Sequence, residues 1–128
     1  MTARLATFCN GRIFDGTRLF DGYAICFEDG HLAGFGPDAE LPDRGEVIDL
    51  AGDILSPGFV DLQVNGGDGM MLNDDPSVET LRRMAKAHRS LGVTQFLPTL
   101  IPDTPENTRA TIAATREANP AGGRGPAG

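Results

Sequence analysis

The stretch Leu55-Ser-Pro-Gly-Phe-Val-Asp-Leu-Gln-Val-Asn-Gly-Gly-Asp-Gly69 decides the fold of this chain. Its proline-glycine pair introduces a short apolar strand, which we expect over residues 59–64. Side chains two apart on a strand point the same way, so Gln63 and Asn65 should face one spot beyond the carboxyl end of this strand. In a parallel barrel, catalytic groups gather at that end.

A helix is predicted after the glycine-rich loop of this stretch. Asp75 is the expected N-cap, and Pro76 would occupy the first helical position, where its missing N–H costs nothing. Gly92 is a suitable residue to end the helix. Four apolar side chains and one histidine recur on one face at helical spacing: Val78, Leu81, Ala85, His88 and Leu91.

A second strand and a second helix follow. Residues 93–97 form an apolar strand that Pro98 ends, and Thr104 with Pro105 begins a helix that continues to about Ala118. The order strand, helix, strand, helix predicts two βα units, the repeat from which parallel sheets and barrels are built. The last ten residues, 119–128, are rich in glycine and proline and should be a disordered tail.

The first 55 residues show short strands separated by closely spaced turn signals. Asn10-Gly11 and Asp29-Gly30 are strong hairpin signals, so each is expected to join two antiparallel strands. With no helical period between the turns, this region predicts part of a β-sandwich. The expected strands are 5–9, 12–14, 23–27, 31–35 and 47–50.

These patterns predict an α/β fold: a partial β-sandwich over 1–55, then the first two βα units of a (β/α)8 barrel over 56–118. The barrel would be incomplete, because 128 residues is well short of the roughly 250 that a barrel takes. The strand over 59–64 is apolar on both faces except at Asp61 and Gln63, so it should be buried between layers.

Composition narrows the class of protein. The net charge of −7 argues against nucleic acid and anionic membrane surfaces as partners. No run approaches the roughly 18 apolar residues of a membrane span, and no leader pattern is present, so a cytoplasmic protein is expected. Cys9 and Cys26 form no metal or disulfide motif and are expected to be small buried hydrophobes.

Three segments together resemble the amino-terminal part of the amidohydrolase superfamily: Phe27–Gly36, Val47–Gly52 and Ser56–Asp61. Most members carry a metal-binding His-x-His where this chain has Gln63-Val-Asn65. That replacement resembles one branch, the N-acetylglucosamine-6-phosphate deacetylases. Gly66, Gly67, Asn73 and the run Phe96-Leu-Pro-Thr-Leu100 add to this resemblance, which covers about residues 4–118.

The resemblance implies metal-dependent hydrolysis of N-acetylglucosamine 6-phosphate to glucosamine 6-phosphate and acetate, in amino-sugar catabolism. Neutral amides are weaker ligands than imidazoles for zinc, so one divalent ion, zinc or similar, is expected in the full-length family rather than two. The family's metal ligands and catalytic aspartate lie in later segments that this sequence does not match. We therefore expect no catalytic residue and no bound metal in this chain.

Four residues remain candidates for lining the substrate pocket: Gln63, Asn65, Gly66 and Gly67. Asp61 is expected to brace the barrel floor or the junction with the sandwich. His31 is expected to be an exposed or edge strand residue and His88 a core histidine, since neither has a second histidine at ligand spacing. Where the family has His-x-Glu-Gly-Pro, this chain reads Gly123-Arg-Gly-Pro-Ala-Gly128, so we expect a shortened chain or a changed reading frame near Ala121, inactive alone.

The expected partner is a phosphorylated amino sugar, and the parent family is expected to form homo-oligomers. Two alternatives stay open. The chain could be part of another amidohydrolase, dihydroorotase-like or an amino-acid deacylase, or it could be a non-catalytic β-rich binding module.

Overall fold

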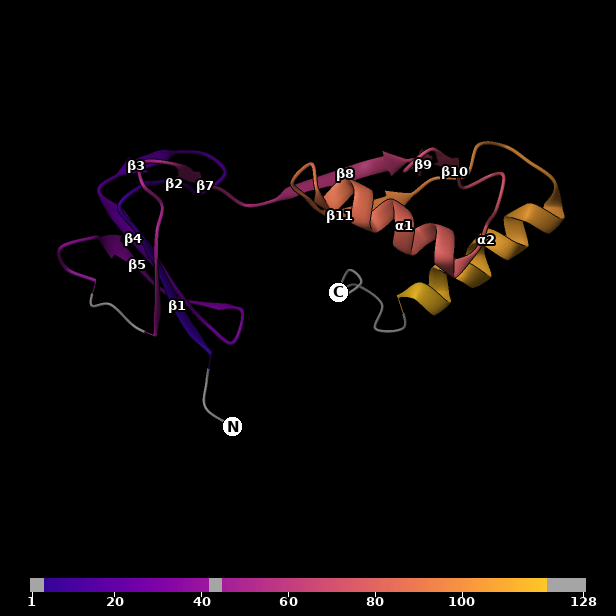
Figure 1. Ribbon diagram of the computed structural model, residues 1–128. Coiled ribbons are helices and arrows are strands. Elements are labelled where there is room, and N and C mark those ends of the chain that lie inside the picture. Colours follow the sequence, from indigo (N-terminus) through magenta and orange to yellow (C-terminus); the bar gives the residue numbers. More distant parts are fainter. Residues whose placement is uncertain (1–3, 42–44, 120–128) are drawn as a thin grey trace. The chain divides into compact units, whose positions relative to one another are not determined.

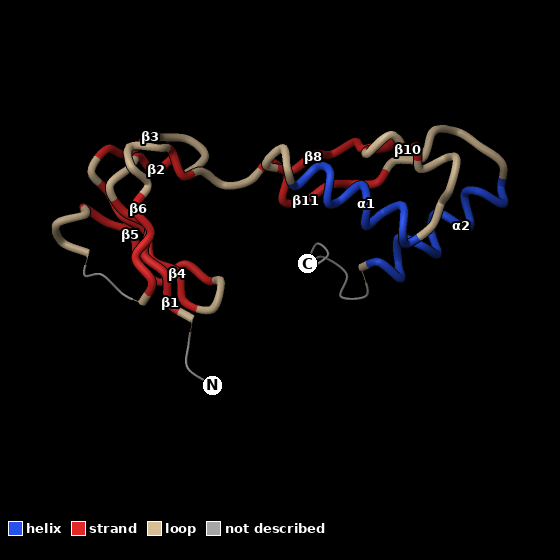
Figure 2. Tube along the Cα trace, viewed as in Figure 1, coloured by secondary structure: helices blue, strands red, loops and turns tan. Residues whose placement is uncertain are grey.

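A computed structural model describes residues 4–41 and 45–119 of the chain (Figure 1). The chain divides into two compact units, Met1–Pro57 and Gly58–Gly128, which are described separately below. The expected disordered tail lies outside the described residues from position 120 onward; Asn119 ends a helix. Strands make up the described part of the first unit, and both helices belong to the second (Figure 2).

A four-stranded sheet forms most of the first unit. The Asp29-Gly30 hairpin is confirmed: both residues have positive φ, 49° and 79°, as a two-residue hairpin turn requires. Thr7, Ala24 and Cys26 are fully buried along its central strands. The strands, in spatial order, are β5 (His31–Pro37), β4 (Tyr23–Glu28), β1 (Leu5–Cys9) and β6 (Glu46–Asp49).

A three-stranded sheet completes the first unit. Phe20 of this sheet lies 5.0 Å, between ring centroids, from both Tyr23 and Phe35 of the four-stranded sheet, so aromatic side chains join the two sheets. Ile13 is buried at its centre. The strands, in spatial order, are β3 (Leu19–Asp21), β2 (Arg12–Phe14) and β7 (Ile54–Leu55); β3 and β7 were not predicted.

The predicted Asn10-Gly11 hairpin is wrong. β1 and β2 lie in different sheets, and the chain between them is tied to a distant turn instead. The Asn10 side chain donates to Asp49 Oδ1 at 2.7 Å, and the backbone carbonyl of Asn10 accepts from Gly52 N at 2.8 Å. These contacts hold β6 parallel to β1, whereas only antiparallel pairing had been expected.

The second unit contains the predicted strand, helix, strand, helix order. β8 (Phe59–Val64) and β11 (Val93–Pro98) pair in parallel, as expected of consecutive βα units. The helices are α1 (Val78–Arg89) and α2 (Pro105–Ala118). The loop after β8 contains a small hairpin that the sequence did not indicate, β9 (Gly66–Gly67) with β10 (Met70–Met71).

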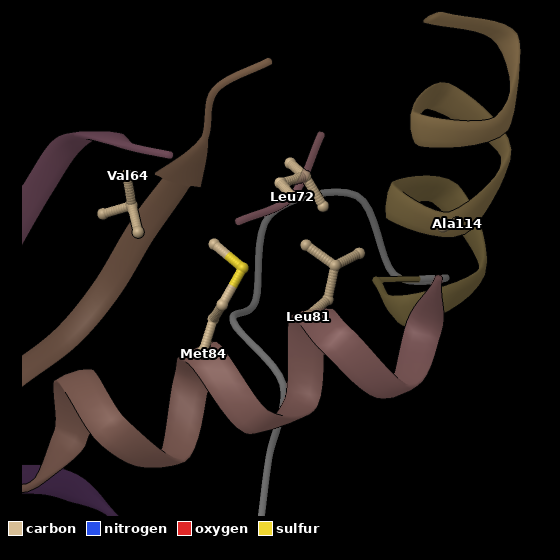
Figure 3. Packing of buried hydrophobic residues seen from close by; sticks show 5 residues of the cluster. All are labelled: Val64, Leu72, Leu81, Met84 and Ala114. Carbon is tan, nitrogen blue, oxygen red and sulfur yellow. The ribbon is translucent and has the colours of Figure 1, made fainter. Parts of the chain in front are cut away.

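Five buried side chains form the core of the second unit (Figure 3). Leu72 and Met84 are fully buried, and Leu81 extends from α1 beside them. The cluster also includes one residue of β8 and one of α2, so it fixes both helices and the loop against the strand. Its members are Val64, Leu72, Leu81, Met84 and Ala114.

The ends of α1 differ from the prediction, whereas the start of α2 is confirmed. Ser77, not Asp75, is the N-cap of α1, because its hydroxyl accepts from Thr80 N at 3.2 Å. The helix ends at Arg89, so Leu91 lies beyond it and is 72% exposed. Thr104 caps α2 with Pro105 in its first turn, as predicted.

The expectation that β8 is buried between layers is wrong for this chain. Phe59 and Leu62 are each 69% exposed, and Val60 is 57% exposed. Among the described residues, β8 pairs only with β11, so each strand keeps one open edge. The two helices leave apolar surface of this small sheet in contact with solvent.

Candidate functional site

The carboxyl ends of β8 and β11 place the two predicted amide residues in different roles. Asn65 is half-buried, and its Nδ2 donates to the Thr99 carbonyl at 2.8 Å, which joins the end of one strand to the end of the next. Gln63 is exposed, and its backbone N–H donates to Asp61 Oδ1 at 3.0 Å. One amide thus fixes the strand ends, while the other presents its side chain to solvent.

Gly66 and Gly67 permit close packing of the loop on α1. A Cβ at Gly66 would collide with the Met70 carbonyl oxygen, and one at Gly67 would lie 3.1 Å from His88 Nε2. His88 Nε2 lies 3.0 Å from the Gly66 carbonyl oxygen. That oxygen can only accept, so Nε2 carries the hydrogen. His88 also stacks on Phe96, consistent with the structural role expected for it.

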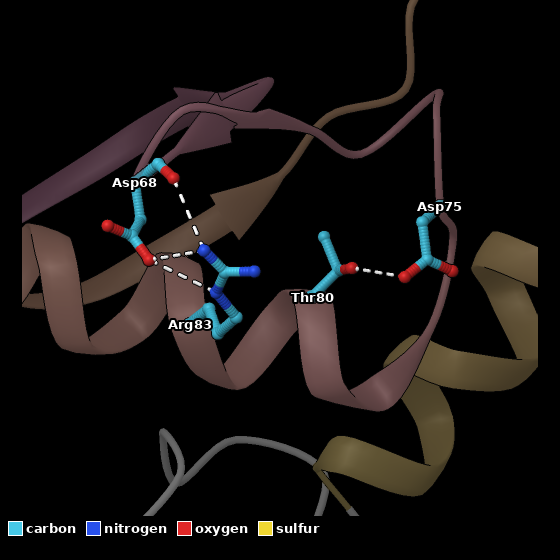
Figure 4. Close-up of polar contacts among 4 residues, drawn as sticks. All are labelled: Asp68, Asp75, Thr80 and Arg83. Atoms are coloured by element: carbon cyan, nitrogen blue, oxygen red, sulfur yellow. Dashed lines mark hydrogen bonds and ion pairs between the residues drawn. The ribbon is translucent and has the colours of Figure 1, made fainter.

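Charged side chains hold the same loop at two further points (Figure 4). Asp68, at the tip of the β9–β10 hairpin, accepts from Arg83 Nε at 3.0 Å and from Nη2 at 2.7 Å. Asp75 Oδ2 accepts from Thr80 Oγ1 at 2.8 Å, next to the start of α1. The β8–α1 loop is therefore fastened to α1 along its length.

A polar cluster that no sequence pattern indicated joins the β8–α1 loop to the β11–α2 loop. Asn73 Nδ2 donates to Asp103 Oδ2 at 2.8 Å and to the Ile101 carbonyl at 3.0 Å. Asn107 Nδ2 donates to Asp103 Oδ2 at 3.0 Å. Hydrogen bonds from Asn107, from the backbone N–H of Thr104 and from Asn73 lower the pKa of Asp103 below its ordinary value. Asn73, Asp103 and Asn107 are spread over 34 residues with no regular spacing, so the sequence does not predict that they meet.

Two cavities over the described residues are lined by residues other than the four candidates. A cavity of about 350 Å³ lies between β8, β11 and the two helices, and its walls are mostly apolar, including Leu62, Leu81 and Ala118. A second, of about 340 Å³, lies over the four-stranded sheet beside Phe8 and Phe27. The first cavity reaches the carboxyl end of β11 at Pro98.

The described residues do not fit the metal ion that the resemblance implies. Over 4–41 and 45–119, no three histidine, cysteine, aspartate or glutamate side chains lie close enough together to hold a metal. A structural or catalytic zinc site requires at least three protein ligands. Within the same ranges, neither helix is long and apolar enough to cross a membrane.

Comparisons with known proteins agree with this architecture. The family described as the NagA composite domain matches residues 7–55. The N-acetylglucosamine-6-phosphate deacetylase of Haemophilus influenzae is 46% identical over 81 residues, 63% of this chain and 21% of that protein. The N-acetylgalactosamine-6-phosphate deacetylase of a Shewanella strain is 49% identical over 69 residues, 54% of this chain and 18% of that protein.

A solved structure covers nearly the whole chain. The N-acetylglucosamine-6-phosphate deacetylase of Pasteurella multocida superposes with a TM-score of 0.87 at 30% identity, over 94% of this chain and 32% of that one. This chain spans about a fifth of the length of the curated relatives it matches. By sequence and fold, this chain matches the amino-terminal region of N-acetylglucosamine-6-phosphate deacetylases.

Proposed function

We propose that this chain supplies the amino-terminal part of an enzyme that hydrolyses N-acetylglucosamine 6-phosphate. Water would add to the acetamide carbonyl and the C–N bond would break, giving glucosamine 6-phosphate and acetate. The observation that carries the proposal is the agreement of two independent likenesses, 46% identity to one such deacetylase and a TM-score of 0.87 to another. We place this reaction in cytoplasmic amino-sugar catabolism, within a homo-oligomeric enzyme.

In this proposal, β8 and β11 are the first two strands of a (β/α)8 barrel, and residues 1–55 form part of its accompanying β-sandwich. Their parallel pairing with α1 as the crossover helix supports that arrangement. Gln63, Asn65, Gly66 and Gly67 would line the substrate pocket at the carboxyl ends of the strands. The exposed Gln63 amide is free to meet a sugar hydroxyl, while Asn65 holds the rim in place.

The divalent ion expected in this family would polarise the acetamide carbonyl and activate water. Because the described residues provide no group of three ligands, its ligands would come from segments other than these. In this proposal, the described residues of this chain shape the substrate pocket and orient the substrate. The chain by itself, with zinc added, is expected to release no acetate from N-acetylglucosamine 6-phosphate, and measurable turnover would refute that expectation.

N-acetylgalactosamine 6-phosphate is the second candidate substrate. The relative named for this epimer is 49% identical over 69 residues, and the N-acetylglucosamine-6-phosphate deacetylase of Haemophilus influenzae is 46% identical over 81 residues. A dihydroorotase from Mycobacterium tuberculosis matches over 41 residues, 32% of this chain. This shorter match gives less support to a dihydroorotase-like function.

A chimera tests the proposed function. Residues 4–118 of this chain would replace the superposed region of the Pasteurella multocida enzyme. Acetate release would be measured with both amino-sugar phosphates, and ring opening to carbamoyl aspartate would be measured with dihydroorotate. We expect hydrolysis of N-acetylglucosamine 6-phosphate above the other two substrates. A folded, metal-loaded chimera that hydrolyses none of the three would contradict the proposal.

Two variants of the chimera test the pocket residues. Gln63→Ala and Asn65→Ala should each lower kcat/KM by about tenfold or more, because each removes a group proposed to contact or fix the substrate site. Gln95→Ala is the matched control, because Gln95 is an exposed amide on the neighbouring strand that lines the apolar cavity instead. Equal activity of all three variants would remove Gln63 and Asn65 from the site.

A further inference from the structure

The Asn73 side chain pairs with the backbone of the next βα loop in the way that a strand would. Its Nδ2 donates to the Ile101 carbonyl at 3.0 Å, and its Oδ1 accepts from the Ile101 N–H at 3.1 Å. The amide thus satisfies both polar groups of one residue in an irregular segment. Asn73 lies four residues before Ser77, the N-cap of α1, so this contact fastens the β8–α1 loop to the β11–α2 loop.

Asp103 completes the pairing. Its Oδ2 accepts from Asn73 Nδ2 at 2.8 Å and from Asn107 Nδ2 at 3.0 Å, while its Oδ1 accepts from Thr104 N at 2.7 Å. Asn107 Nδ2 also donates to the Asn73 carbonyl at 3.3 Å. We call these four residues, Asn73, Ile101, Asp103 and Asn107, the loop clamp. Hydrogen bonds to a carboxylate are stronger than those between neutral groups, so Asp103 is its strongest member.

The loop clamp holds the same segment that Asn65 contacts. The Thr99 carbonyl accepts from Asn65 Nδ2 at 2.8 Å, and Thr99 N donates to the Val64 carbonyl at 2.8 Å. Residues 99–103 are therefore fixed near residue 99 by the end of β8 and near residue 101 by Asn73. Without Asn73, the second attachment is lost, and the segment that carries the partner of the Asn65 amide is held only at residue 99, by the end of β8.

We propose that Asn73 and Asp103 are positioning residues, which lock the two βα loops together and so hold the Asn65 amide at the rim of the substrate pocket. The link to the substrate rests on the proposed function. The locking of the loops does not, because it is a property of the described residues alone. Side chains that orient a site residue through a supporting contact of this kind commonly matter as much as the residue they support.

Hydrogen exchange of the full 128-residue chain tests the locking. Asn73→Ala should speed exchange of the backbone amides of Thr99 and Ile101 by about fivefold or more, because it removes the hydrogen bonds from its side chain to Ile101 and Asp103. Asp74→Asn is the matched control, since this neighbouring carboxylate is exposed, and it should leave those rates unchanged. Equal rates in the two variants would overturn the proposal, whatever the enzyme activity proves to be.

A reciprocal exchange of the two side chains separates pairing from general loss of structure. Asn73→Asp alone would set two carboxylates against each other and should speed exchange more than Asn73→Ala does. Adding Asp103→Asn restores one amide and one carboxylate, so the double variant should recover at least part of the protection. A double variant no better protected than Asn73→Asp would contradict a direct Asn73–Asp103 pairing.

Kinetics of the chimera test the link to the substrate. Asn73→Ala should raise KM by about tenfold with a smaller change in kcat, because a displaced Asn65 weakens substrate binding rather than the chemical step. The reciprocal double variant should recover KM in part. If exchange responds as expected but KM does not, the loops are locked and the assigned effect on substrate is wrong; an inactive chimera would contradict the proposed function instead.

Discussion

The two units of the chain bury their strands to very different degrees. In the first unit, β4, β1 and β2 each have a partner strand on both sides, and Ala24 is fully buried. In the second unit, β8 and β11 have only each other among the described residues, and Leu62 is 69% exposed. Backbone ladders therefore organise the first unit, whereas helix packing and loop contacts organise the second.

In the second unit, a buried helix core and loop contacts support a sheet of only two described strands. Leu72 and Met84 are completely buried although the strand beside them is not. Two spectroscopic signals separate the units, because Tyr23 is the only tyrosine, there is no tryptophan, and both described helices lie in the second unit. Tyrosine fluorescence reports on the first unit, and helical circular dichroism reports on the second.

Met84→Ala should give the largest effect and should act on the second unit alone. Emptying a fully buried site in the helix core should lower the free energy of unfolding by about 3 kcal/mol. The loss should be seen in a denaturant titration followed by helical circular dichroism. Leu91→Ala is the control, because this leucine is 72% exposed and its truncation should change stability by no more than about 0.5 kcal/mol. Equal effects would show that the helix core is not the main support.

Gly11→Ala tests the crossing between the two sheets of the first unit. A Cβ at Gly11 would lie 2.5 Å from Leu50 Cβ and 2.7 Å from the Asp53 carbonyl oxygen, so we expect a loss of about 2 kcal/mol in the transition followed by Tyr23 fluorescence. Gly36→Ala is the matched control, because no atom lies within 4 Å of its added Cβ. A Gly11→Ala variant as stable as the control would contradict the close approach of Gly11 to Leu50 and Asp53.

Ser77→Ala should cost the second unit about 1 kcal/mol, because Ser77 caps the first turn of α1. Asp75→Asn removes the charge of the residue that the sequence indicated as the cap and should cost less. The comparison is made by helical circular dichroism during denaturation. If Asp75→Asn proves the more damaging of the two, the carboxylate and not the serine hydroxyl starts this helix.

Acid should produce the smallest effect, and mostly in the first unit. The Ala51 N–H and the Asn10 amide lower the pKa of Asp49 from its ordinary 3.8, and backbone N–H groups of Arg18 and Thr17 lower that of Asp15. A lowered pKa in the folded state adds stability that is complete above 3.8 and is lost as the pH falls through the lowered value.

Asp49→Asn should therefore flatten the loss of stability of the first unit below pH 4, as followed by Tyr23 fluorescence. Asp53→Asn serves as the control, as an exposed carboxylate on the same turn. An acid response that Asp49→Asn leaves unchanged would show that the contacts of Asp49 do not differ between the folded and unfolded states.

Local chemistry made several elements predictable. Asp29-Gly30 formed its hairpin because both residues tolerate positive φ, and Thr104-Pro105 started α2 because each fits its position without any distant partner. Asn10-Gly11 has the same local signal, yet contacts with Asp49 and Gly52, about 40 residues away, redirected the chain. The turn propensity of Asn10-Gly11 depends on these two residues alone, so it cannot predict contacts with residues that are distant in the sequence.

Residue types and short-range periods were enough to predict the family resemblance, the parallel βα order and the residues at the end of β8. Only the tertiary structure separated Gln63, which is exposed, from Asn65, which is bonded to Thr99. Only it brought Asn73 to Asp103, since the contact needs two loops 30 residues apart to meet at one end of the strands. Long-range contacts of polar side chains have no period, so they are decided by the packing that brings them together.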